Sequence, residues 1–125
     1  MSEANLILSR KDYLDLMVLQ LSADLRTELE QAIVVPVESI EPDVVTIGAR
    51  VKYYDHKTNS HREIEIVLPE DVDSAYGRVS VLAPVGAALI GLKEGQVIDW
   101  DFPDGSMRRL TVISVIQPEA VRLSQ

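Results

Sequence analysis

The chain has 125 residues and a formal net charge of −8. It contains no cysteine, which excludes disulfides and thiolate metal sites. The negative charge argues against direct nucleic-acid binding, because phosphate recognition needs clustered Lys and Arg side chains. A hydrophobic content of 46% is enough for one domain with a buried core. No apolar run reaches the length of a membrane span and the first residues lack a secretory signal, so we expect a cytoplasmic protein without a membrane partner.

Residues 9–33 carry the spacing of an amphipathic helix. Apolar side chains recur at intervals of three and four along this segment, and Ser9 is suited to cap its first turn. Two arrangements fit the pattern: a single helix of about 24 residues, or a helical hairpin that breaks near residues 21–23, with Ser22 capping the second helix. The helical region ends before Pro36, because a residue that precedes proline avoids the helical conformation.

After residue 43 the hydrophobic period changes to two, which is typical of strands. Strands are predicted at residues 44–55, with a bend or bulge at Gly48, and at residues 62–68, 78–83, 96–102 and 107–117. Short polar segments connect them, so we predict a mostly antiparallel sheet and an α+β fold. The predicted domains are an N-terminal helical arm, residues 1–36, and a sheet domain, residues 37–125.

The glycines between the third and fourth predicted strands invite comparison with a phosphate-binding loop. Gly86 and Gly91 are separated by four residues, but Leu92 stands where such a loop needs lysine. Pro84 instead suits the first turn of a short helix, and Gly91 suits its left-handed end. We therefore predict a short helix here, without nucleotide binding.

Several motifs occur in the order found in one known family. The segments PDVVTIGARVKYYD, RVSVLAPVGAALIGLKEGQVIDWDFPDG and LTVISVIQPEA resemble the C-terminal domain of the bacterial Gre transcript-cleavage factors and, more closely, the Rnk proteins, named as regulators of nucleoside diphosphate kinase. The resemblance covers roughly residues 28–120. It implies an FKBP-like sheet domain with one short helix, preceded by an antiparallel coiled-coil hairpin.

The same resemblance implies a regulator that binds RNA polymerase near its secondary channel. Gre-type domains dock at the rim of that channel, and the segment they use there matches Ala83, Pro84 and Val85. In Gre factors a long coiled coil enters the channel, and acidic residues at its tip help to hold a catalytic magnesium ion. In this chain Asp24 would lie near the tip, with Glu28 one turn on, and we expect both to face basic channel walls.

The helical arm departs from the Gre pattern in its length. Helices of about 10–12 residues span roughly 15–18 Å, several times less than a Gre arm. We therefore expect no transcript cleavage, no catalytic residue, no metal or other cofactor, and no enzymatic activity. Two alternatives stay open: Gre-type cleavage through Asp24 and Glu28, and indirect regulation of nucleoside diphosphate kinase without polymerase contact. The oligomeric state is also open.

Three further residues are interpreted as structural. His56 and His61 flank a polar turn, but their spacing does not match a metal site. Trp100 is predicted to lie in the core, because one Trp, one Phe and four Tyr are too few to line an isomerase-type pocket and fill a core as well.

Overall fold

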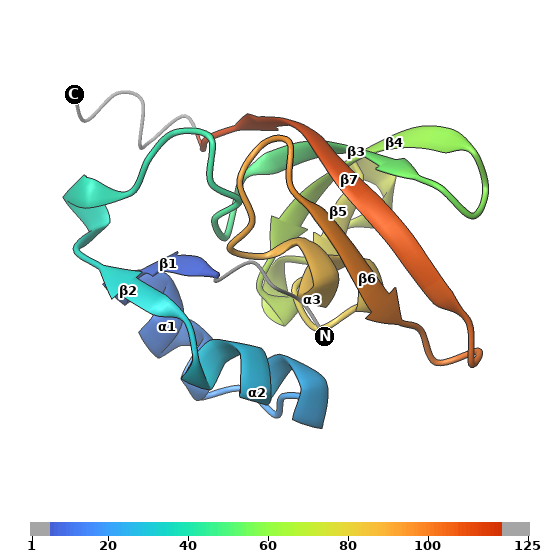
Figure 1. Ribbon diagram of the computed structural model, residues 1–125. Coiled ribbons are helices and arrows are strands. Elements are labelled where there is room, and N and C mark those ends of the chain that lie inside the picture. The colour runs from blue at the N-terminus through green and yellow to red at the C-terminus, as the bar shows by residue number, and fades with distance from the viewer. Residues whose placement is uncertain (1–5, 119–125) are drawn as a thin grey trace.

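The computed structural model describes residues 6–118 of the chain, and its main element is a curled five-stranded sheet in the order β5-β4-β3-β7-β6 (Figure 1). A small parallel sheet joins β1 to β2. The strands are β1 Ile7–Ser9, β2 Ile33–Val35, β3 Arg50–Asp55, β4 Ser60–Val67, β5 Arg78–Ser80, β6 Val97–Asp101 and β7 Met107–Ile116. The helices are α1 Arg10–Met17, α2 Ala23–Glu30 and α3 Pro84–Leu89. The predicted α+β class is confirmed.

The five-stranded sheet is antiparallel except at its β5 edge, where β5 runs parallel to β4. The first predicted strand is shorter than expected, because β3 begins only at Arg50 and the residues before it form a turn. Gly48 bends the chain in that turn, and a separate register shift against β7 lies between Lys52 and Tyr53. The β6–β7 hairpin turns over residues 102–106, as the sequence predicts.

The short helix α3 explains the glycines that superficially suggested a phosphate loop. Pro84 occupies the first turn, and Gly91 follows the helix with a φ of +83°, a left-handed conformation that favours glycine. Gly86 is needed for a different reason, since a Cβ at this position would clash with the carbonyl oxygen of Ser80. The segment is therefore a close-packed corner between strands.

The N-terminal segment forms two helices rather than one. The side chain of Ser9 accepts a hydrogen bond from the N–H of Asp12 at the start of α1, and Ser22 accepts one from Leu25 at the start of α2. Each cap satisfies a backbone donor that the helix itself leaves unpaired, which fixes both starting points. None of the helices within residues 6–118 is long and apolar enough to cross a membrane.

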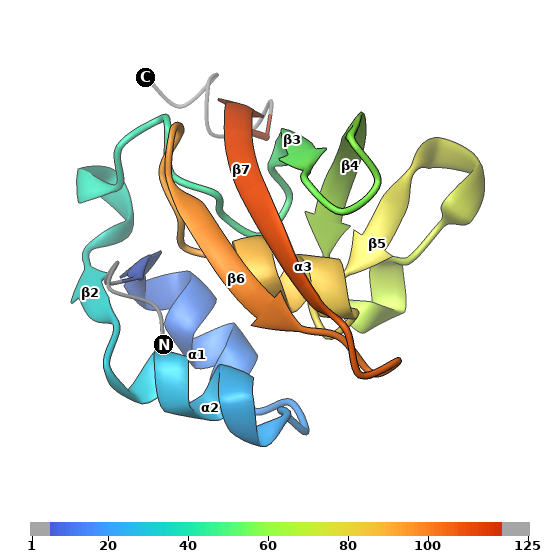
Figure 2. The same cartoon turned by 45° about the vertical axis from the view of Figure 1, so that its right-hand side comes forward.

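One hydrophobic core extends across the predicted domain boundary at residue 36. Leu16, Leu25 and Leu29 are at most 1% exposed and belong to the same cluster as buried residues of the sheet. Figure 2 shows both helices side by side, next to the edge strand β6. The described part of the arm is thus packed onto the sheet, whereas the coiled coil, the FKBP-like assignment and the boundary itself stay predictions.

Candidate functional site

The first turn of α3 forms one wall of a cavity of about 220 Å³, which we call the α3 pocket. Pro84 and Val85 line it and are both half-buried. Ala83 stands just before them as the N-cap residue of α3 and is also half-buried. The other walls belong to the sheet and the β6–β7 hairpin, and are formed by Tyr53, Asp55, Arg62, Phe102, Arg108 and Leu110.

An ion pair fixes the polar end of the α3 pocket. Asp55 is 3% exposed, and its carboxylate accepts a hydrogen bond of 3.1 Å from Nη1 of Arg108. The guanidinium of Arg108 also lies 4.7 Å from the ring centroid of Phe102, within cation–π range. Nε of Arg108 is buried and has no acceptor among residues 6–118. The pocket therefore combines apolar walls with the cationic side chains of Arg62 and Arg108.

Tyr53 adds a second polar group to the same apolar surroundings. Burial raises the pKa of its hydroxyl, and the nearby charge of Arg62 partly offsets this effect. The hydroxyl is consequently protonated at neutral pH. Chemically, the α3 pocket can take an apolar side chain and donate hydrogen bonds to a neighbouring acceptor, which is the chemistry of a docking site.

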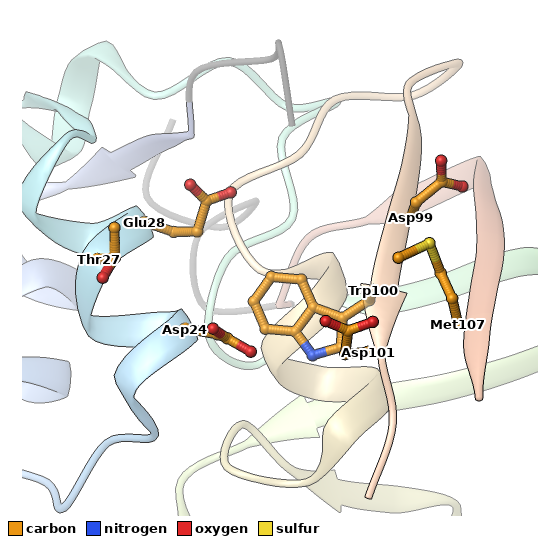
Figure 3. A pocket seen from close by; sticks show the side chains of 7 residues that line it. All are labelled: Asp24, Thr27, Glu28, Asp99, Trp100, Asp101 and Met107. Carbon is orange, nitrogen blue, oxygen red and sulfur yellow. The ribbon is translucent and has the colours of Figure 1, made fainter. Parts of the chain in front are cut away.

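A second cavity, of about 300 Å³, lies between α2 and β6, and we call it the α2–β6 cavity. Asp24 and Glu28 line it from α2. Asp99, Trp100 and Asp101 line it from β6. Figure 3 shows the side chain of Asp24 pointing toward the indole of Trp100, whereas the carboxylate of Glu28 turns upward beside it. The two acidic residues predicted from the arm therefore face the sheet.

The carboxylates of the α2–β6 cavity differ in their surroundings. Asp99 is held by Arg109, whose Nε and Nη2 donate to its two oxygens at 2.9 and 3.2 Å, and this pairing lowers the pKa of Asp99. Partial burial raises the pKa of Glu28, and the neighbouring charge of Asp24 raises it further. Asp99 is thus paired with a cationic side chain, whereas Glu28 forms no ion pair with a side chain of residues 6–118.

The two cavities share no lining residue but have the β6–β7 hairpin between them. Asp101 lines the α2–β6 cavity, whereas the next residue, Phe102, lines the α3 pocket. The same division occurs on β7, where Met107 faces the first cavity and Arg108 the second. The predicted residues therefore lie at two separate cavities and not at one.

Sequence reasoning missed several residues of these sites. No pattern in the sequence predicted Arg62 or Arg108 as site residues. Asp55 could have indicated Arg108, because an acidic residue at an inward-facing position of a strand is rarely buried without a cationic partner. Trp100, predicted as a core residue, packs against the core but is only partly buried and also lines the α2–β6 cavity. His56 contacts Thr111 through its Nε2, at 2.8 Å from Oγ1. Residues 6–118 contain no group of three or more side chains suited to bind a metal ion.

Residues 40–117 match the sequence family described as "Transcription elongation factor, GreA/GreB, C-term". The chain belongs to the GreA/GreB family. This match includes the whole five-stranded sheet, α3 and every residue of the α3 pocket. The predicted relationship to the Gre factors is confirmed.

Individual relatives within the GreA/GreB family support the same assignment. The chain is 38% identical over 97 residues to the regulator of nucleoside diphosphate kinase of Escherichia coli K12, covering 77% of this chain and 71% of that protein. It is 33% identical to transcription elongation factor GreA of Azorhizobium caulinodans over 93 residues, which are 74% of this chain but only 59% of GreA. The chain thus spans about three fifths of that GreA protein.

A solved structure extends the similarity to the fold of nearly the whole chain. It is described as the prokaryotic transcription elongation factor GreA/GreB from Nitrosomonas europaea, with 33% identity and a TM-score of 0.71. The superposition covers 91% of this chain and 99% of that one. The relatives together indicate a regulator of the transcription-elongation-factor type.

Proposed function

We propose that the chain binds RNA polymerase at the rim of the secondary channel through the α3 pocket, and that it does not stimulate transcript cleavage. The observation that carries the proposal is the position of Pro84 and Val85 in the wall of a preformed cavity that is partly apolar. The resemblance to Gre-type domains implies that these residues belong to the segment used for docking.

The α3 pocket suits a protein partner that presents an apolar side chain. Its walls of Pro84, Val85, Phe102 and Leu110 can enclose such a side chain, and removing that surface from water favours binding. The guanidinium groups of Arg62 and Arg108, which also line the pocket, can then donate to a backbone carbonyl or carboxylate of the partner. The pocket thereby selects both for apolar shape and for one acceptor.

The short arm supports a non-catalytic role. Helices α1 and α2 contain eight residues each, so each spans roughly 12 Å. A carboxylate assists catalysis only when it is held within a few ångströms of the reacting atoms. The arm is packed against the sheet, and Asp24 and Glu28 face β6. If the sheet domain binds at the channel rim, both carboxylates therefore lie far from the buried active centre of the polymerase.

The test is the affinity of the chain for purified RNA polymerase core enzyme, measured by surface-immobilised binding. Pro84→Glu should weaken binding at least tenfold, about 1.4 kcal/mol, because a charged side chain replaces an apolar wall of the pocket. A glutamate at the first turn is compatible with the helix, so the variant should stay folded. The matched control is Pro69→Glu, which makes the same exchange at the start of another short helical turn, on the exposed surface.

Unchanged affinity in folded Pro84→Glu, or an equal loss in both variants, would remove the α3 pocket from the interface.

A second candidate function rests on the relative named for regulating nucleoside diphosphate kinase. Under that alternative the chain regulates nucleoside diphosphate kinase without binding RNA polymerase. Absence of binding by the unaltered chain, at concentrations where a Gre factor binds, would favour it.

A further inference from the structure

The α2–β6 cavity lies along a free edge of the sheet. In the strand order β5-β4-β3-β7-β6, the last strand pairs only with β7 among residues 6–118, and α2 lies beside β6 across the cavity. The cavity of about 300 Å³ occupies this gap, with α2 forming the opposite wall (Figure 3). Its walls thus come from both predicted domains.

The floor of this cavity is an aromatic face. Trp100 is partly buried, packs against the core on one side and projects toward α2 on the other (Figure 3). The indole ring has the most negative face among aromatic side chains and attracts a cation placed over it. An open indole face in a cavity is therefore a feature that points to a ligand with a positive charge.

The rim carries matching negative charge. Asp24 and Glu28 approach from α2 and Asp101 from β6, and none of the three forms an ion pair within residues 6–118. Asp99 differs, since Arg109 already neutralises it. Partial burial raises the pKa of Glu28, and the charge of Asp24 raises it as well. A cation placed between these groups would relieve the repulsion and strengthen its own contact with the indole.

We infer that the α2–β6 cavity receives an arginine side chain of a protein partner, stacked on Trp100 and bonded to the carboxylates of Asp24, Glu28 and Asp101. A guanidinium suits this arrangement better than an ammonium, because it is planar, stacks on an aromatic face and donates in several directions at once. The inference rests on the proposed function for the identity of the partner, RNA polymerase. It assigns the acidic residues a specific acceptor role in place of a general attraction to basic walls.

The cavity contains its own reporter, because Trp100 is the only tryptophan of the chain. The probe is the peptide acetyl-Gly-Arg-Gly-amide, titrated at constant ionic strength while tryptophan fluorescence is followed. The expected result is a saturable fluorescence change. The citrulline peptide, which keeps the shape of arginine without its charge, should produce none, and the lysine peptide should bind more weakly.

A double variant tests the carboxylates directly. Asp24→Asn with Glu28→Gln should weaken binding of the arginine peptide by about fivefold or more, as expected for loss of charge-assisted hydrogen bonds. The matched control is Glu38→Gln with Glu70→Gln, which removes the same charge from exposed positions away from the cavity. A non-saturable response of the unaltered chain, or equal weakening in both double variants, would overturn the inference.

The polymerase assay separates this inference from the proposed function. Both Pro84→Glu and the Asp24→Asn, Glu28→Gln variant should bind polymerase more weakly, but only the second should lose the arginine peptide. If polymerase binding is intact and depends on Pro84 while no arginine peptide binds, the cavity inference fails and the proposed function stands. If the arginine peptide binds as expected but polymerase does not, the proposed function fails and the cavity remains a guanidinium site.

Discussion

The carboxylate of Asp12 accepts a hydrogen bond of 3.0 Å from the backbone N–H of Ile47, joining the first turn of α1 to the turn that precedes β3. Asp12 is only 5% exposed. Burial raises the pKa of its carboxyl above the ordinary value of 3.8, and the hydrogen bond from Ile47 opposes that rise. The helical arm is therefore held to the sheet by a buried acid as well as by apolar packing.

This contact gives a prediction about pH. The pKa of Asp12 is higher in the folded chain than in the unfolded chain. At pH values between these two pKa values, the folded state therefore binds more protons than the unfolded state. The contribution of Asp12 to the free energy of unfolding thus decreases as pH rises through the folded pKa. Asp12→Asn retains an oxygen acceptor and removes the charge, so it should be as stable as the unaltered chain at pH 7, or more stable.

The alanine variant supplies the control for Asp12. Asp12→Ala leaves the N–H of Ile47 without its acceptor and should lower the free energy of unfolding by about 1–3 kcal/mol. Urea denaturation of all three proteins at pH 4 and pH 7 measures both effects. Equal stability of the alanine and asparagine variants at pH 7 would show that the hydrogen bond has no stabilising role.

A second prediction concerns the packing of α1. Leu16 is fully buried in the common core, so Leu16→Ala should lower the free energy of unfolding by about 2–5 kcal/mol. Leu14 lies on the same helix but is 54% exposed. Leu14→Ala should therefore change the free energy of unfolding by less than about 0.5 kcal/mol. If the arm folds as an independent unit, Leu16→Ala will instead leave the main unfolding transition unchanged.

A third prediction follows from Gln117, which belongs to the IQPEA motif. Its Nε2 donates to the carbonyls of Pro42 and Val44 at 3.0 and 2.7 Å, and its Oε1 accepts from Oγ1 of Thr46 at 2.6 Å. The motif residue therefore fastens the end of β7 to the segment that enters the sheet domain. This role is structural, although the same motif also contributes to the resemblance to the Rnk proteins.

Gln117→Met should lower the free energy of unfolding by about 2 kcal/mol or more, because two carbonyls and a hydroxyl lose their buried partner. Gln20→Met at an exposed position serves as the comparison and should have almost no effect. Thermal or urea unfolding checks both variants. A Gln117→Met protein with unaltered stability would mean that water replaces the side chain in all three contacts.

Local signals in the sequence predicted much of this fold. Ser9, Ser22, Pro84 and Gly91 mark helix ends through backbone requirements that depend on few neighbours, and the structure places helix ends at each of them. The alternation in residues 96–102 likewise identified β6. These features are readable because each rests on a single element.

Features that depend on contacts between residues far apart in the chain could not be predicted from the sequence. The parallel pairing of β1 with β2 aligns Ile7 with Ile33 in strands of only three residues, too short for an alternation to be recognised. The two cavities are harder still, since Phe102 and Arg108 meet Pro84 only after the sheet has curled over α3. The resemblance to Gre factors indicated Pro84 and Val85, but it did not indicate which side chains surround them.

RNA length in backtracked RNA polymerase complexes is the most direct measurement of whether the chain occupies the rim without stimulating cleavage. We predict that the chain alone leaves the transcripts uncut, and that an excess of it reduces cleavage stimulated by a Gre factor through competition for the rim. Pro84→Glu should lose this inhibition, whereas Pro69→Glu should retain it. Transcript cleavage stimulated by the chain alone, and lost in Asp24→Ala, would contradict the account and establish a catalytic role for the acidic residues of α2.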